Sequence, residues 1–557
     1  MTDRSTPAGT RGAARHIVDA LLANGADRAF CVPGESYLPL LDALADVADR
    51  LPLITCRHEA AAANMAAAHG RLTGRPGICL VTRGPGATHA SIGLHTAMQD
   101  SLPMILLVGH VPTSDFGREA FQEVDFAAFF GPLVKWAAVV PRGERLPEFM
   151  QRAFAVATSG RPGPVVLALP EDVLDATFDG PPPRPAVPAL AAPDPAAVRA
   201  VADRLRAARR PLLWVGGSTW SDAGWQALRE FAERRRLPVA TSFRRKDCFD
   251  NTHPCYAGEL GFGVNPQLAA RVREADLIVA LGTRLGEVTT AEYTLLAPPF
   301  PRQPLVHVHP DAGEPGRVYR PDVAVPTRPE AFVAALESAL PATPLADEWT
   351  RAARADYEAF VRPPADAHAL QLATFFRTLG ARTPDDAIYT NGAGNYALFL
   401  HRFVEHRRLG TQVAPTSGAM GYSVPAALAA KLAHPDRTVV CVAGDGCFLM
   451  TAQELATAVQ YGIGVKFLVV DNGTYGTIRM HQERRYPGRP YATALRNPDF
   501  AAMARSYGLD AWRAATTADA LAALEPWLAA SGPALLHLIV EPEQIAPGRR
   551  LSTLTSA

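Results

Sequence analysis

The sequence has no excess of either charge and no long hydrophobic run. Lys plus Arg and Asp plus Glu each number 55 in 557 residues, so the formal net charge is zero. Such a balance gives no field that favours nucleic acid or an anionic membrane. The chain also lacks the run of about 18 apolar residues that a membrane helix needs, and its first residues, MTDRSTPAGTRGAARH, hold no signal-peptide core. We therefore expect a cytoplasmic protein with no membrane or nucleic-acid partner.

The cysteines are few, and their spacing shows no pairs. The seven cysteines are odd in number and form no CxxC pair, which argues against a disulfide framework and against a structural zinc site. Basic residues are nearly all arginine. The length exceeds what one hydrophobic core supports, and it suggests three domains of ordinary size.

The segment from Gly444 to Asn472 is the most informative part of the chain. Residues 438–443 and 465–470 are apolar runs typical of buried parallel strands, and Thr451 and Glu454 fit a T-x-x-E capping box of the helix between them. Asp445 and Asn472 then follow two strands joined by one crossover, at the sheet edge where ligands bind.

A carboxylate and an amide oxygen beside glycine amides suit Mg²⁺ carrying a diphosphate. The Asp-Gly dipeptide alone fits an ordinary α/β turn equally well. The interval of 27 positions between Asp445 and Asn472 argues against that simpler interpretation.

The rest of the chain alternates helix and strand. This order predicts an α/β fold of three doubly wound parallel-sheet domains. Residues 165–169 are expected to close the first sheet, and the proline-rich stretch 181–197 is expected to be an extended linker. The domains expected are a pyrimidine-binding domain (1–180), a central domain (190–340) and a diphosphate-binding domain (360–550).

Seven ordered stretches resemble the acetolactate synthase-like family of thiamine diphosphate (ThDP) enzymes, over essentially the whole chain. They are VPGES (32–36), RHEAAAANMAAAHGRLTGRPGICLVTRGPGATH (57–89), AFQEVD (120–125), GRPGPVVLALPEDV (160–173), SGAMGY (417–422), the segment 444–472 and NPDFAAMARSYG (497–508). The resemblance implies ThDP and Mg²⁺ as cofactors. It also implies a homodimer or homotetramer whose active sites lie at the subunit interface, with Glu59 and Asp445 from different chains.

The resemblance also assigns roles to residues. Glu59 is the carboxylate that hydrogen-bonds the pyrimidine of ThDP; without the resemblance, a partner of the helix dipole is the better explanation. Met420 wedges beneath the cofactor, and the metal is bound by Asp445, Asn472 and the Thr474 carbonyl. The further cofactor-binding residues implied are Pro33, Gly394, Asn395, Gly418, Gly444, Gly446, Cys447 and Tyr475. Cys447 looks like a reactive thiol, but a packing role is favoured. The implied catalytic residues are Glu59, Gln122 and His481, and the implied substrate pocket consists of Glu35, Ser36, Phe121, Gln122 and His481.

Several departures from the family surround the implied substrate pocket. His481 stands where branched-chain biosynthetic enzymes carry a Trp that selects 2-ketobutyrate, and Glu171 stands where they carry a Lys. Glu35 and Ser36 replace the usual Gly and Ala, although Glu35 alone also fits a solvated loop. His89 replaces the usual Asn of GPGATN, for which a structural reason is favoured. These changes argue for a different acceptor or a different fate of the donor.

We therefore predict a ThDP- and Mg²⁺-dependent carboligase or lyase acting on a 2-oxo acid or related small carbonyl compound, outside branched-chain biosynthesis. The alternatives are a C–C hydrolase of a diketone and a non-catalytic ThDP-binding homologue. A nicotinamide dehydrogenase would need GxGxxG after a first strand, which Gly84-Pro85-Gly86 does not supply. FAD in the central domain is left open and slightly disfavoured, because His309 stands where FAD-binding relatives place an acidic residue.

Overall fold

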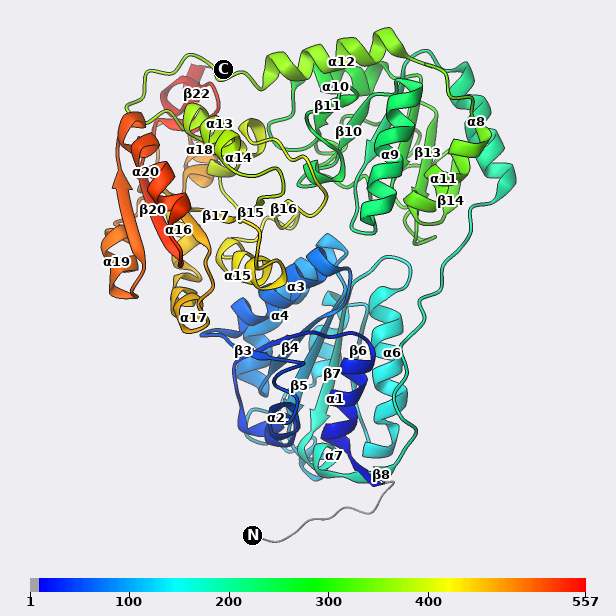
Figure 1. Ribbon diagram of the computed structural model, residues 1–557, viewed down its shortest axis with the longest axis vertical. Helices are drawn as coiled ribbons and strands as arrows, with labels where there is room; N and C mark the ends of the chain where they lie inside the picture. The colour runs from blue at the N-terminus through cyan, green and yellow to red at the C-terminus, as the bar shows by residue number, and fades with distance from the viewer. Residues whose placement is uncertain (1–9, 557) are drawn as a thin grey trace. The chain divides into compact units, whose positions relative to one another are not determined.

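The computed structural model describes residues 10–556, and these form three six-stranded parallel sheets (Figure 1). The predicted fold class is confirmed. Two antiparallel pairs accompany the three sheets: β1 (Thr10–Gly12) with β8 (Thr177–Asp179), and β21 (Gln544–Ala546) with β22 (Arg549–Arg550).

The first sheet has the order β3-β2-β4-β5-β7-β6. Its strands are β2 (Ala29–Cys31), β3 (Leu53–Thr55), β4 (Gly77–Val81), β5 (Met104–His110), β6 (Trp136–Val139) and β7 (Pro164–Pro170). The expectation that 165–169 closes this sheet is wrong, because β6 lies beyond β7 at the edge. The sequence WAAV is short and half-buried, so it shows neither a long apolar run nor a strict alternation.

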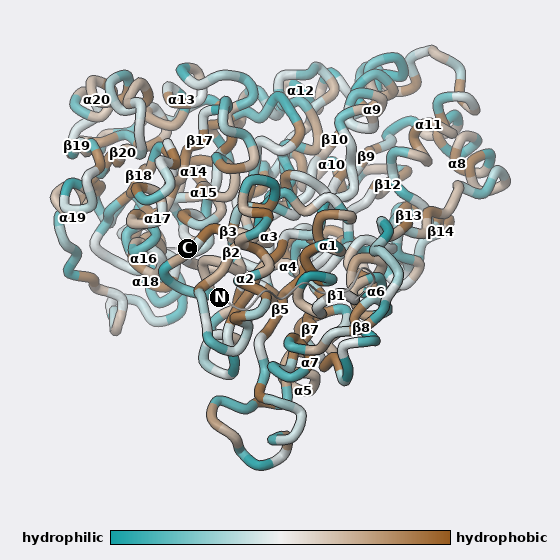
Figure 2. The backbone as a smooth tube through the Cα atoms, turned by 60° about the horizontal axis from the view of Figure 1, so that its bottom comes forward, coloured by the Kyte–Doolittle hydropathy of each residue, from teal (hydrophilic) through white to brown (hydrophobic). Residues whose placement is uncertain are grey.

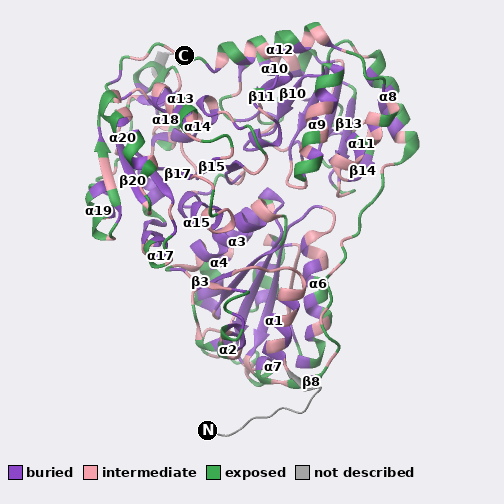
Figure 3. Cartoon of the chain, in the orientation of Figure 1, coloured by how far each residue is buried: buried purple, intermediate pink, exposed green. Residues whose placement is uncertain are grey.

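Helices cover both faces of the first sheet. Alternate residues of its strands, such as Ala29, Cys31, Ile105 and Leu107, pack with α1 (Ala13–Ala23), α2 (Leu38–Ala45) and α6 (Leu146–Thr158) in one core cluster. The other helices of this part are α3 (Glu59–Thr73), α4 (Gly84–Asp100), α5 (Phe126–Phe130) and α7 (Glu171–Asp175). Figure 2 shows β5 and β7 as largely hydrophobic, and Figure 3 shows the central strands of this sheet as buried. Both faces are therefore dry.

The second sheet has the order β11-β10-β9-β12-β13-β14. Its strands are β9 (Pro211–Val215), β10 (Val239–Thr241), β11 (Tyr256–Glu259), β12 (Leu277–Leu281), β13 (Leu305–His309) and β14 (Val323–Pro326), and its helices are α8 (Pro195–Ala207), α9 (Asp222–Arg235), α10 (Pro266–Glu274), α11 (Pro329–Ala339) and α12 (Asp347–Phe360). The predicted linker ends at Asp194, whose carboxylate accepts from the backbone N–H groups of Ala196 and Ala197 and so caps α8.

The third sheet has the order β16-β15-β17-β18-β20-β19. Its strands are β15 (Ile388–Asn391), β16 (Gln412–Val413), β17 (Val439–Gly444), β18 (Lys466–Asp471), β19 (Asp510–Ala514) and β20 (Ala534–Ile539). Its helices are α13 (Leu372–Arg382), α14 (Tyr396–Phe403), α15 (Ser423–Ala433), α16 (Asp445–Leu449), α17 (Leu455–Gln460), α18 (Gly476–Arg485), α19 (Phe500–Ser506) and α20 (Thr517–Ala529).

Each sheet reverses its strand order once near its centre, apart from the edge strands β6 and β19, which lie outside β7 and β20. The reversal lies between β2 and β4 in the first sheet, between β9 and β12 in the second, and between β15 and β17 in the third. In open α/β sheets this point opens a crevice at the carboxyl ends of the strands, where ligands bind. The turns after β4 and β17, which begin at Thr82 and Asp445, therefore occupy the positions that the fold offers to a ligand.

The chain divides into two compact units. The first runs to Ala189 and also includes residues 428–433 and 453–460; the second comprises the remainder. The three domain ranges expected from the sequence stay a prediction. Within residues 10–556, no helix is both long enough and apolar enough to cross a bilayer.

The predicted capping box at Thr451 and Glu454 is wrong. The Thr451 hydroxyl donates to the Gly421 carbonyl at 3.0 Å instead of capping a helix. The Glu454 carboxylate accepts from the backbone N–H of Arg57 at 3.0 Å and from the Thr457 hydroxyl. A contact distant in sequence has replaced the local one, which a pattern of four residues does not reveal.

Candidate functional site

The carboxyl edge of the third sheet brings two aspartates together. Gly444 pairs with Val470 in the β17–β18 ladder, so Asp445 and Asp471 follow in step at the end of their strands. The Asn497 amide bridges them, donating to Asp445 Oδ2 at 2.7 Å and to Asp471 Oδ1 at 2.8 Å. Asp471 and Asn497 were not singled out from the sequence, although both lie within stretches that were, 444–472 and 497–508.

The two carboxylates differ in their electrostatic environment. Burial raises the pKa of Asp445 to about 6, against the opposing hydrogen bonds from Gly446 N–H and Asn497, and the neighbouring Asp471 adds to the rise. Burial also acts on Asp471, but hydrogen bonds from His537, Asn497 and Gly473 N–H outweigh it and lower its pKa. A buried carboxylate next to a second one is a favourable place for a cation.

The residues present fit Mg²⁺. Asp445 supplies a carboxylate, and Asn472 follows Asp471 directly with an amide oxygen that also accepts from Thr474 N–H at 3.2 Å. The Thr474 carbonyl accepts one hydrogen bond, from Gly476 N–H at 2.8 Å, which leaves its second lone pair. These are the oxygen ligands that Mg²⁺ prefers, and few enough that phosphate and water complete its shell.

Glycines at this edge make room for two tyrosines. A Cβ on Gly446 would lie 2.5 Å from the Tyr475 ring, and a Cβ on Gly444 would lie 2.8 Å from the Tyr396 ring. Tyr396 also donates to Cys447 Sγ at 3.5 Å, and Cys447 Sγ accepts from Gly421 N–H at 3.2 Å. The buried Cys447 thiol is thus enclosed by packing partners, in keeping with the packing role favoured from the sequence.

The other implied cofactor residues of the second unit lie in nearby loops. Asn395 precedes α14, accepts from the Thr477 hydroxyl at 2.9 Å and contacts Met480 of α18, so α14 and α18 meet there. His481 follows Met480 and is exposed. Gly418 has a positive φ of 70° with open space around it, and Met420 is half-buried against the core of the third sheet.

In the first unit, Glu59 opens α3 and pairs with a histidine. Glu59 Oε2 lies 2.9 Å from His89 Nδ1, and the Glu59 side chain is 12% exposed against 53% for His89. The His58 ring lies 4.6 Å from the His89 ring, and His58 Nδ1 accepts from Ala60 N–H at 3.1 Å, which caps α3. Burial and the neighbouring His89 lower the pKa of His58.

His58, Glu59 and His89 bring their ligand atoms within 4.8 Å of one another. This is the one such group of three among residues 10–556. A metal there is disfavoured by the helix cap, because a neutral His58 that accepts at Nδ1 carries its proton on Nε2. That nitrogen then has no lone pair for an ion.

Arg83 contacts two of the four implied substrate-pocket residues of the first unit, and it also contacts Glu171. Its guanidinium pairs with Glu171, lies 3.7 Å from Glu35 and donates to the Phe121 carbonyl at 3.5 Å. The Gln122 carbonyl accepts from Gly84 N–H at 3.0 Å, and Gln122 has a left-handed φ of 65°. One buried cation therefore faces two carboxylates.

Ser36 is buried below this group. Its hydroxyl lies 3.0 Å from Thr82 Oγ1, and a Cβ on Gly109 would clash with it at 2.2 Å. Pro33 is exposed at the same edge. The sequence stretch TRGPG held the signal for Arg83, as a charged residue directly after a buried strand.

His110 is a second residue that the sequence did not single out. It ends β5 and packs against Phe116 and Phe126, each with a ring distance of 4.8 Å. Burial lowers its pKa, the charge of Glu123 opposes this, and Arg83 lowers it further. His110 is thus neutral beside the Arg83 group.

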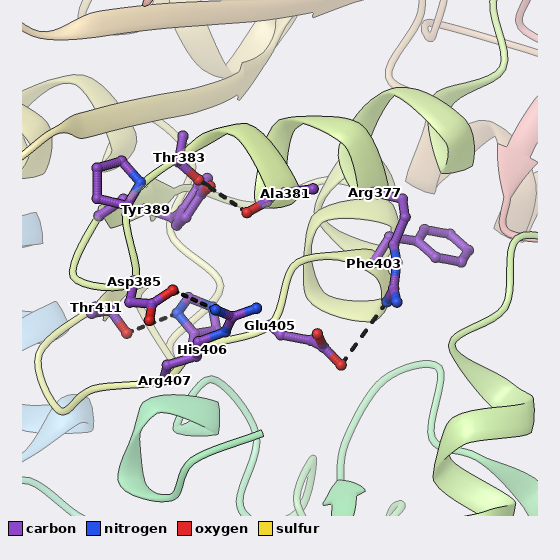
Figure 4. Close-up of a pocket in the computed structure, with 13 residues that line it drawn as sticks. Arg377, Ala381, Thr383, Asp385, Tyr389, Phe403, Glu405, His406, Arg407 and Thr411 are labelled. Carbon is purple, nitrogen blue, oxygen red and sulfur yellow. Dashed lines mark hydrogen bonds and ion pairs between the residues drawn. The ribbon is translucent and has the colours of Figure 1, made fainter. Parts of the chain in front are cut away.

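A separate cavity of about 110 Å³ lies in the second unit (Figure 4). Its polar side chains pair with one another: Asp385 with Arg407, His406 with Thr411 and Arg377 with Glu405. Ala387 and Thr411, which line it, precede β15 and β16. The cavity therefore lies at the amino edge of the third sheet, opposite the Asp445 edge, and contributes no residue to it.

Comparison with known proteins gives matches along nearly the whole chain. Family models of thiamine pyrophosphate enzymes match in order: the N-terminal TPP binding domain at residues 11–129, the central domain at 198–336 and the C-terminal TPP binding domain at 392–538.

Curated relatives include acetolactate synthases of several microbes. The chain is 36% identical to the acetolactate synthase large subunit of Parasynechococcus marenigrum (strain WH8102), covering 91% of this chain and 84% of the relative. It is 32% identical to the acetolactate synthase isozyme 2 large subunit of Escherichia coli (strain K12), covering 95% of each. It is 31% identical to a probable acetolactate synthase large subunit of Methanocaldococcus jannaschii, over 97% of this chain and 94% of that protein.

Proposed function

The chain belongs to the family of thiamine pyrophosphate enzymes that includes the acetolactate synthase large subunits, and from this premise we propose a ThDP- and Mg²⁺-dependent carboligase or lyase. Its substrates are small carbonyl compounds, with a 2-oxo acid as the favoured donor. The observation that carries the proposal is the paired Asp445 and Asp471 beside the Gly446 turn, at the point where the third sheet reverses its strand order.

Different residues of this edge bind the metal ion and the diphosphate. Asp445, Asn472 and the Thr474 carbonyl hold Mg²⁺, which carries the diphosphate. The backbone around Gly394, Asn395, Gly446 and Cys447 supplies N–H groups to the anion. When bound, the cofactor supplies a carbon nucleophile and an electron sink next to the substrate carbonyl.

Glu59 and Met420 prepare the cofactor for this chemistry. Glu59 would hold or release a proton at a carboxylate oxygen that reaches the pyrimidine nitrogen, and Met420 would pack against the bound cofactor. Glu59 belongs to the first unit and Asp445 to the second. We propose that in a homodimer or homotetramer they reach one active site from different subunits.

The acceptor is proposed to be neutral instead of a second keto acid. Arg83 faces both Glu35 and Glu171, so one guanidinium meets two carboxylates and the group keeps a net negative charge. A second anionic acceptor pays an electrostatic cost at such a mouth. His481 in place of an apolar Trp also removes the wall that distinguishes 2-ketobutyrate from pyruvate, a difference worth only about 1–3 kcal/mol.

The test is a competition between acceptors. The enzyme is given pyruvate as donor with 2-ketobutyrate, a second pyruvate or acetaldehyde as acceptor, and the products are quantified. We expect the aldehyde to be favoured, and Glu35→Gln with Glu171→Gln to shift the ratio toward keto acids by about tenfold. Glu144→Gln, an exposed carboxylate at a distant position, is the control. Strong preference for 2-ketobutyrate in the unmodified enzyme would return it to branched-chain biosynthesis.

A different reaction class is detected by trapping the covalent cofactor adduct with a panel of 2-oxo acids and diketones. An adduct from diketones only would favour the C–C hydrolase, and no adduct would favour a non-catalytic homologue.

FAD is not included in the proposal. Gly216 and Gly217, which could approach a nucleotide, are required by packing, since a Cβ on them would lie 2.6 Å from Ser242 Oγ and 2.3 Å from the Gly282 carbonyl. Flavin absorbance of the purified protein tests this.

A further inference from the structure

We propose that His89 is a proton carrier that connects Glu59 to solvent during the turnover of the cofactor. This inference rests on the proposed function, because it concerns the carboxylate assigned to the ThDP pyrimidine. The observation behind it is the 2.9 Å contact between His89 Nδ1 and Glu59 Oε2.

The contact is fixed by the packing of two helices. A Cβ on Gly93 of α4 would lie 2.4 Å from the Cβ of Ala63 on α3, so the helices touch backbone to backbone there. Glu59 and His89 each lie four residues before this crossing, and residues four apart share a helix face. The same close approach that requires Gly93 therefore holds Glu59 against His89.

The hydrogen bond has a defined direction when Glu59 is ionised. A carboxylate only accepts, so His89 Nδ1–H donates and Nε2 is left to face away from Glu59. The His89 side chain is 53% exposed while that of Glu59 is 12% exposed. His89 thus has one nitrogen on the buried carboxylate and an exposed ring that water reaches.

The second carboxylate oxygen stays available to the cofactor. Glu59 Oε1 lies against the first turn of α4, 3.4 Å from where a Cβ of Gly86 would stand. When a protonated Glu59 gives the proton on Oε1 to the pyrimidine nitrogen, the carboxylate can be reprotonated at Oε2 by His89 Nδ1–H while Nε2 takes a proton from a hydronium ion or a buffer acid. One proton has then moved inward and the external acid has become its base. His89 is left with its proton on Nε2, and the reverse transfer or a turn of the exposed ring restores the starting tautomer.

His58 is excluded as the carrier although its ring lies beside that of His89. Its Nδ1 accepts from Ala60 N–H, and burial lowers its pKa, so it is a neutral ring that serves the helix cap. The titratable groups that contact His89 are His58 from the loop before α3 and Glu59 from α3 itself.

The first measurement needs no cofactor. In the protein labelled with ¹⁵N-histidine, the Nδ1–H of His89 should give a hydrogen-bonded imidazole signal protected from rapid exchange. It should be missing in His89→Asn and moved in Glu59→Gln. His95→Asn, another histidine of α4, should leave it unchanged. A wild-type spectrum without such a signal would overturn the pairing.

The second measurement separates a carrier from a merely positioning side chain. Asn at position 89 keeps an N–H donor for Oε2 but does not carry protons. We expect hydrogen–deuterium exchange at the cofactor C2 carbon to slow about ten- to hundredfold in His89→Asn, and to recover when imidazole buffer is added. His95→Asn should exchange like the wild type.

The outcomes separate this inference from the proposed function. If Glu59→Gln loses exchange while His89→Asn keeps the wild-type rate, or slows without recovery in imidazole, the carrier role is wrong and the function stands. If ThDP does not bind, or Glu59→Gln exchanges normally, the proposed function itself fails.

Discussion

At the scale of single residues, Glu59 is the group proposed to exchange a proton with the cofactor pyrimidine. One of its carboxylate oxygens contacts His89, and the other is open to the cofactor. Glu59→Gln keeps the shape of the side chain but cannot exchange a proton with the pyrimidine. We expect ThDP to bind within a few-fold of normal and C2 exchange to fall by about a hundredfold or more. The two quantities are measured by calorimetry and by NMR. Equal exchange rates in the variant and the wild type would remove Glu59 from the mechanism.

His309 makes a prediction about stability and pH. Burial and the neighbouring His307 lower the pKa of His309 to about 4 from 6.5. As the pH falls, the unfolded chain therefore takes up this proton before the folded protein does. The stability that the neutral His309 gives to the folded protein is complete above pH 6.5 and is lost between about pH 6.5 and 4. The loss amounts to about 3 kcal/mol for a shift of this size.

The matched variant is His309→Asn, whose oxygen can accept from Asp311 N–H as His309 Nδ1 does at 3.1 Å. Urea unfolding of both proteins at pH 7.5 and 4.5 gives the difference, in which other titrating groups cancel. The wild type should lose more stability than the variant on acidification. Parallel changes in the two proteins would contradict the assignment.

Single residues also show where sequence alone was enough. Asp445 and Asn472 could be placed at the carboxyl edge of the sheet because the strands before them are continuous apolar runs, and the metal-binding role given to them stays a prediction. Arg83, Asp471 and His110 were missed because their importance comes from what they contact. Arg83 contacts Glu35 and Glu171, which lie 48 and 88 positions away in the sequence. A local sequence pattern does not reveal a contact between residues that lie so far apart in the chain.

At the scale of elements, three of the four lysines of the chain cap the carboxyl ends of helices. Lys135, Lys246 and Lys466 donate from Nζ to carbonyl groups at the carboxyl ends of α6, α14 and α20. A helix leaves its last carbonyls without partners, and an ammonium group with three N–H donors can satisfy several of them. In a chain that otherwise uses arginine, lysine is retained at these helix ends.

Lys246 allows a test of this role. It is buried, donates to the carbonyls of His401 and Val404, and burial lowers its pKa to about 8. Lys246→Met keeps the aliphatic stem but leaves two buried carbonyls without donors, so we expect a loss of about 2 kcal/mol in unfolding free energy. Arg199→Met, an exposed cation of α8, should change it by less than about 0.5 kcal/mol. If both substitutions changed the unfolding free energy equally, the proposed capping role of Lys246 would be wrong.

Elements also explain which strands the sequence revealed. The runs around β4, β5, β7, β12 and β17 are buried on both faces and read as continuous apolar stretches. The edge strands β6, β14 and β19 are only four or five residues long, and most of their residues are partly buried or exposed. Their partners in the sheet stabilise them more than their own composition does.

At the scale of the whole molecule, the proposed sharing of active sites between subunits can be tested by mixing two inactive variants. Glu59→Gln and Asp445→Ala subunits are unfolded together, refolded and assayed. If the two residues come from different chains, each mixed dimer has one intact site and one doubly altered site. Random pairing then restores about a quarter of the wild-type activity.

If both residues came from the same chain, every site in the mixture would carry one alteration and activity would stay absent. Each variant refolded alone is the control.

The binding of ThDP is the property on which the other proposals depend. Titration calorimetry with ThDP is carried out on the purified protein with Mg²⁺ and after chelation, and on Asp445→Ala, with Asp510→Ala as a control for an exposed aspartate. The account predicts binding that requires the divalent cation, is lost in Asp445→Ala and is unchanged in Asp510→Ala. Binding of ThDP that persists after chelation and in Asp445→Ala would contradict it.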